Sequence, residues 1–78
     1  MTKHEILTQA LEARQQEIMG YQINIDNYTL AIAYIEKSGD ADLTEFCGKL
    51  EASLLTEKLE QKKAMVIRFV IQQQLETL

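Results

Sequence analysis

Apolar residues recur along the first half of the chain at intervals of three, four or seven positions. This period is typical of an α-helix that packs lengthwise against another helix. The residues of this seam are Leu7, Leu11, Ile18, Tyr21, Ile25, Tyr28, Ile32 and Ile35. Ser38-Gly39-Asp40 interrupts the pattern, and a second helical pattern follows it. The sequence therefore predicts an all-α, coiled-coil-like hairpin of two long antiparallel helices, forming one domain over residues 1–78.

The ends of both predicted helices carry capping signals. Thr2 and Glu5 match the capping-box pattern, and Gly39 suits a left-handed C-terminal cap. Asp42 and Glu45 form a second box. A short antiparallel connection places residues whose numbers sum to roughly 80 at similar heights. The expected elements are a first helix over about 2–38, a turn over about 39–41 and a second helix over about 42–77.

Further apolar residues lie outside the seam, where an isolated hairpin cannot cover them. A core of 78 residues is marginal by itself, and exposed apolar stripes usually mark interfaces. We expect two hairpins to form a homodimeric four-helix bundle, with a larger oligomer as the alternative. The candidate oligomer interface consists of Met19, Ile23, Leu30, Met65, Val66, Ile67, Phe69, Val70 and Ile71.

Polar residues occupy several positions of the predicted seam. Arg14 interrupts the seam of the first helix, and steps of seven along the second helix place Glu57, Gln61 and Arg68 inward as well. Buried charges are rare unless they are paired. This candidate polar seam is expected to fix register and oligomer state. A polar contact site for another protein is the alternative interpretation.

The residues that could carry catalysis are far apart in the predicted hairpin. Cys47 is the single cysteine and His4 the single histidine. In the hairpin they would lie about 45–50 Å apart, which is too far for a catalytic pair. The chain contains no Glu-x-x-His motif, which is typical of metal-binding helical bundles. We expect no catalytic residue, no cofactor and no metal.

The formal net charge of −4 argues against a chain built to bind phosphate. Basic residues concentrate only at Lys58, Lys62, Lys63 and Arg68. These lysines are either a solvated stripe paired locally with glutamates or a small anion or nucleic-acid contact. No apolar run approaches the roughly 20 residues that span a membrane, and the N-terminus lacks a signal-peptide pattern. We therefore expect a cytoplasmic protein without membrane contact.

These observations favour a non-enzymatic protein–protein interaction module, such as a small adaptor, inhibitor or regulator. Its expected partners are a second copy of itself and an unidentified protein. The alternative is a nucleic-acid-associated regulatory factor that uses the Lys58–Arg68 stretch.

Overall fold

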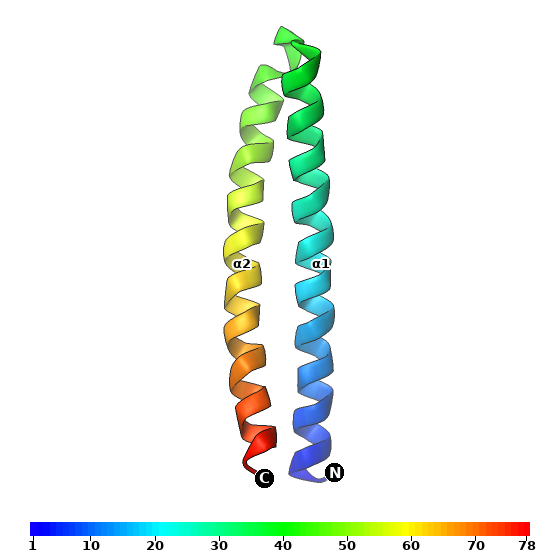
Figure 1. Cartoon of the computed structure of the whole chain (residues 1–78), viewed down its shortest axis with the longest axis vertical. Coiled ribbons are helices and arrows are strands. Elements are labelled where there is room, and N and C mark those ends of the chain that lie inside the picture. Colours follow the sequence, from blue (N-terminus) through cyan, green and yellow to red (C-terminus); the bar gives the residue numbers. More distant parts are fainter.

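The computed structural model describes residues 1–78 as a hairpin of two long α-helices (Figure 1). Helix α1 spans Lys3–Ser38 and helix α2 spans Thr44–Glu76, with the short 3₁₀ helix η1 at Ala41–Leu43 between them. Both termini lie at one end and the turn at the other, and the molecule measures 57 × 15 × 14 Å. The predicted all-α antiparallel hairpin is confirmed.

Two of the predicted caps are present at the ends of α1. The backbone N–H of Glu5 donates to Thr2 Oγ1 at 3.1 Å, which satisfies a free donor of the first turn. At the other end Gly39 adopts a φ of 65° in the left-handed region, and its N–H donates to the carbonyl of Ile35. α1 therefore has a capping interaction at each of its ends.

The predicted capping box of Asp42 and Glu45 is wrong. The Asp40 side chain instead accepts from the N–H of Asp42 at 2.9 Å and caps η1. This 3₁₀ turn moves the start of α2 to Thr44, so that Leu43 occupies the N-cap position without a side-chain hydrogen bond. A short aspartate side chain that bonds the backbone two residues ahead competes effectively with the longer-range box.

A continuous heptad seam joins the two helices. All the α1 seam residues are buried or half-buried, with Ile18, Ile25 and Ile35 each only 8% exposed. The matching seam begins in η1 and continues along α2, and all its residues are buried or half-buried. It consists of Leu43, Cys47, Leu50, Leu54, Glu57, Gln61, Ala64, Arg68, Ile71 and Leu75. Hydrogen bonds from Gln61 to the Ile18 carbonyl and from Asn24 to Glu57 agree with the predicted register. The two antiparallel helices thus pack against each other along one seam of heptad spacing.

Most of the chain is nevertheless exposed. Only 7 of the 78 residues are buried, and no large side chain is completely enclosed. The accessible surface is 5792 Å² for a mass of 9.0 kDa. A compact monomer of that mass would expose about 4,900 Å², so the hairpin carries a surplus of about 900 Å². Neither helix has a segment long and apolar enough to cross a membrane.

Alanine substitutions at Gly20 and Gly39 should change stability in opposite directions. A Cβ atom would meet nothing within 4 Å at either position. Gly20 lies inside the uninterrupted helix α1, where alanine should raise the free energy of unfolding by about 1 kcal/mol. Gly39 has a positive φ, so alanine at this position should lower the free energy of unfolding by about 1–2 kcal/mol. Urea denaturation of both variants measures the two signs, and a loss of stability at Gly20 would contradict its open surroundings.

Candidate functional site

The predicted oligomer interface is exposed at all but one of its residues. Met19, Ile23, Leu30, Val66 and Phe69 are each 59–68% exposed, and Met65, Ile67 and Val70 are 38–47% exposed. Ile71 differs, because it is 8% exposed and lies in the seam between the two helices. It therefore contributes to the intramolecular core rather than to the outer surface.

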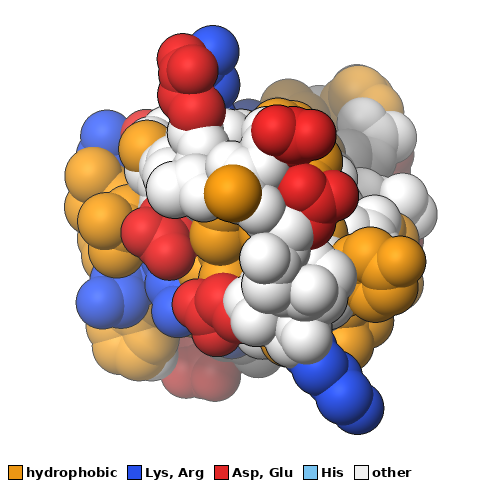
Figure 2. Space-filling model, turned by 90° about the horizontal axis from the view of Figure 1, so that it is seen from above, with side chains coloured by type: hydrophobic (Ala, Val, Ile, Leu, Met, Phe, Trp, Pro, Cys, Tyr) orange, Lys and Arg blue, Asp and Glu red, His pale blue; other side chains and the backbone are white.

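Two ordered stripes run along the outer sides of the helices. The outer stripe of α1 consists of Met19, Ile23, Asp26, Leu30 and Ala33, and the outer stripe of α2 consists of Leu55, Leu59, Lys62, Val66 and Phe69. All ten residues are exposed. The spacing of four and three within each stripe is that of a second heptad seam. The end-on view of Figure 2 shows hydrophobic side chains at both its left and right edges, the sides on which Figure 1 places α2 and α1.

The polar seam forms hydrogen-bonded layers near the middle of the hairpin. Arg14 Nη1 pairs with Glu17 Oε2 at 2.8 Å, and the Tyr21 hydroxyl donates to Glu17 Oε1 at 3.3 Å. Burial raises the pKa of Tyr21, and the negative charges of Glu17, Glu60 and Glu57 raise it further. Because Arg14 pairs with Glu17, its charge is neutralised within its own helix.

The α2 side of this polar seam is less completely satisfied. Gln61 Nε2 donates to the Ile18 carbonyl and to Gln22 Oε1, at 3.3 and 2.9 Å. Glu57 Oε1 accepts from Asn24, but its second oxygen is buried without a hydrogen-bond partner. The predicted inward positions of Glu57, Gln61 and Arg68 are all half-buried.

The predicted basic cluster is partly neutralised within the chain. Lys63 Nζ pairs with Glu60 Oε1 at 3.0 Å, as the local-pairing interpretation expects. Lys58 and Lys62 are exposed and form no ion pair. Arg68 is half-buried in the seam, so it does not extend the exposed basic surface.

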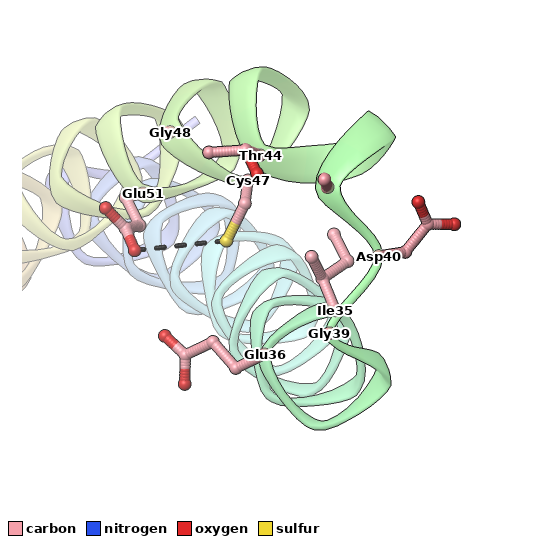
Figure 3. Close-up of a pocket in the computed structure, with 9 residues that line it drawn as sticks. Ile35, Glu36, Gly39, Asp40, Thr44, Cys47, Gly48 and Glu51 are labelled. Atoms are coloured by element: carbon pink, nitrogen blue, oxygen red, sulfur yellow. Dashed lines mark hydrogen bonds between the residues drawn. The ribbon is translucent and has the colours of Figure 1, made fainter.

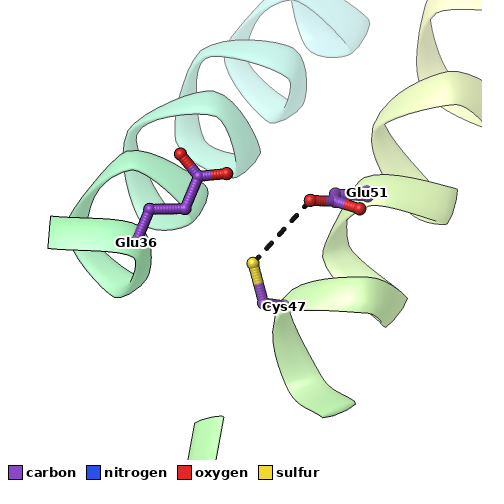
Figure 4. Close-up of side chains that lie close together, drawn as sticks. All are labelled: Glu36, Cys47 and Glu51. Atoms are coloured by element: carbon purple, nitrogen blue, oxygen red, sulfur yellow. Dashed lines mark hydrogen bonds between the residues drawn. The ribbon is translucent and has the colours of Figure 1, made fainter. Parts of the chain in front are cut away.

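An open cavity of about 630 Å³ lies beside the turn, and sequence analysis did not anticipate it. Figure 3 shows Cys47 with Glu51 on one helix and Glu36 on the other, beside the loop that carries Gly39 and Asp40. The sulfur of Cys47 and a carboxylate oxygen from each glutamate lie within 4.8 Å of one another (Figure 4). Glu36 comes from α1 and the other two residues from α2, so only the folded hairpin brings them together.

The chemistry of this cluster is that of an inert thiol. Burial raises the pKa of Cys47, and the charges of Glu51 and Glu36 raise it further. The thiol is therefore protonated at neutral pH and a poor nucleophile. The thiol lies 4.0 Å from Glu51 Oε1, a weak hydrogen bond. His4 lies in the first turn of α1, at the end of the hairpin that carries both termini. Cys47 packs with Ile35 and Leu50 as a small hydrophobic residue.

Replacing Glu51 with glutamine should make Cys47 more reactive. Removing a negative charge beside the thiol lowers the pKa of Cys47, because the thiolate is then less strongly repelled. The rate of alkylation by iodoacetamide, followed as a function of pH, should show a lower midpoint than in the wild type. Glu45→Gln is the matched control, since that carboxylate does not raise the pKa of Cys47. Equal midpoints in the wild type and Glu51→Gln would contradict the electrostatic assignment.

No protein-family model, curated protein or solved structure matches this chain.

Proposed function

We propose that the protein is a non-enzymatic protein–protein interaction module that acts as a homo-oligomer. The observation that carries this proposal is the pair of exposed apolar outer stripes, one on each helix. The surplus surface of about 900 Å² is comparable with the roughly 800 Å² that each partner buries in a standard interface. A second hairpin that covered such a stripe would supply the burial that one hairpin lacks.

Two hairpins bring four helices together, which is the four-helix assembly expected from the sequence. The apolar outer surface favours association driven by burial. The half-buried polar seam supplies register, because its groups lose hydrogen bonds if the helices slide. An assembly of this kind acts as an adaptor, inhibitor or regulator by presenting a fixed helical surface.

Size-exclusion chromatography with light scattering tests the proposal directly. The wild-type protein at micromolar concentration should have a mass of at least two chains of 9.0 kDa. The double variant Ile23→Glu, Val66→Glu places a charge in each outer stripe and should shift the mass toward that of one chain. Ile6→Glu is the control, because Ile6 is also exposed but lies outside both stripes. A folded wild-type monomer at these concentrations would overturn the proposal.

The second candidate function is a nucleic-acid-associated regulatory factor. It is favoured by Lys58 and Lys62, which are exposed and have no ion-pair partner. Its support is smaller, since Lys63 is paired and the whole chain is acidic. Salt-dependent binding of DNA or RNA that is lost in Lys62→Glu, Lys63→Glu would support it. No binding at low salt would end it.

A further inference from the structure

The two outer stripes share one pattern but carry opposite charges at the centre. Each has two exposed side chains that contain only hydrocarbon or thioether groups on either side of a single charged residue. That residue is Asp26 in the outer stripe of α1 and Lys62 in the outer stripe of α2. Neither forms an ion pair within the chain, and the only side-chain hydrogen bond of Asp26 comes from Gln22. The central charge of each stripe is thus free to pair with another molecule.

We propose that the outer stripe of α1 in one copy docks onto the outer stripe of α2 in a second copy, with Asp26 opposite Lys62. This inference rests on the proposed self-association and names the surfaces that meet. Because each stripe is centred on its charged residue, parallel and antiparallel pairing of the two helices both place Asp26 against Lys62. The four apolar residues of each stripe then form two layers on either side of the ion pair.

The alternative contacts between identical stripes are electrostatically unfavourable. Two α1 stripes packed antiparallel would place Asp26 against a second Asp26. Two α2 stripes would place Lys62 against a second Lys62. Like charges that face each other across a helix interface are destabilising, whereas opposite charges select partner and orientation. Charge therefore favours contact between different stripes.

The positions of the stripes make this contact heterologous. At about 100° per residue, the centre of each outer stripe lies roughly 150° around its helix from the seam. The two stripes thus face outward on opposite sides of the hairpin, and the end-on view has hydrophobic side chains at both its left and right edges (Figure 2). A docked pair leaves one stripe of each kind uncovered, so further copies can add until a ring closes or a filament grows.

The two central charges also lie at different heights along the hairpin. Gln61 donates to the Ile18 carbonyl, which places Lys62 near the level of residue 18. Asp26 lies about eight residues nearer the turn than this level, or roughly 12 Å along the helix axis. Copies that keep one orientation would therefore be staggered by this distance, which favours an extended array over a flat ring.

Charge reversal tests the pairing. Asp26→Lys and Lys62→Glu should each weaken self-association at least tenfold, because each places like charges at the centre of the contact. The double variant, and an equimolar mixture of the two single variants, should restore the wild-type apparent dissociation constant. Asp42→Lys and Lys3→Glu are the matched controls, since they change the net charge equally at exposed sites outside the stripes. Sedimentation at low salt measures all these species, and circular dichroism verifies that each is helical.

Zero-length carbodiimide cross-linking of the wild type gives a readout that needs no substitution. In a mixture of unlabelled and isotope-labelled chains, mass spectrometry should find a cross-link between Asp26 of one chain and Lys62 of another. A wild type that associates without this cross-link, and that tolerates both single reversals, would overturn the docking mode while leaving self-association intact. A wild type that stays monomeric would overturn the proposed function as well.

Discussion

Replacing Ile25 with alanine is expected to lower the free energy of unfolding by about 2–5 kcal/mol, the usual cost of truncating a buried isoleucine. Ile25 is 8% exposed at the middle of the seam, where the two helices are the only source of packing. A chain of this length has a total stability of about 4–12 kcal/mol. The substitution should therefore remove a large fraction of the stability of the hairpin. Urea denaturation followed by circular dichroism gives the difference between variant and wild type.

Ile23→Ala provides a control with identical chemistry only two residues away. Ile23 is 59% exposed in the outer stripe of α1, so the same truncation should change the stability of the isolated hairpin by less than about 0.5 kcal/mol. The comparison is made at a concentration low enough to keep the chain monomeric. Equal losses at the two positions would contradict the assignment of Ile25 to the seam.

The sequence predicted the hairpin well because one physical requirement repeats along both helices. A seam that meets a second helix needs an inward residue every three or four positions, and steps of seven along α2 lead to Glu57, Gln61 and Arg68, which are all half-buried. The same steps, continued from Leu50, reach Ile71. Residues 65–71 are apolar on nearly every side of the helix. The apolar composition of this segment therefore did not distinguish the buried Ile71 from its exposed neighbours.

Features that depend on tertiary contact or on local competition were not predictable in this way. The cavity beside Cys47 requires Glu36 from one helix and Glu51 from the other, and no spacing in the sequence joins them. The start of α2 depended on competition between two aspartates. The side chain of Asp40 accepts a hydrogen bond from the N–H of Asp42. The resulting 3₁₀ turn forms in place of the capping box predicted for Asp42 and Glu45. The candidate interface predicted from the sequence contains Val66 and Phe69 but not Leu55 and Leu59, which belong to the same outer stripe of α2 by heptad position.

Replacing Glu57 with leucine is expected to raise the free energy of unfolding by about 1–3 kcal/mol. Glu57 occupies a seam position, and one of its carboxylate oxygens is buried without a partner, an arrangement that costs about 1–3 kcal/mol. Leucine removes this cost and adds apolar surface to the seam. Asn24 loses its acceptor, but it is exposed and can bond to water. Chemical denaturation measures the gain, and Lys58→Leu is the control at an adjacent exposed site, with little expected change.

The same variant separates stability from the selection of register. The negative charge of Glu57 contributes to the raised pKa of Tyr21, so its removal should lower the pKa of that tyrosine in a spectroscopic titration. If polar seam residues fix register, the stabilised variant should also give a broader distribution of assembly masses than the wild type, because leucine tolerates sliding that a carboxylate opposes. A less stable variant would show instead that the Glu57 carboxylate is favourable in the folded hairpin. Greater stability with an unchanged mass distribution would assign register to the remaining polar seam residues Arg14, Gln61 and Arg68.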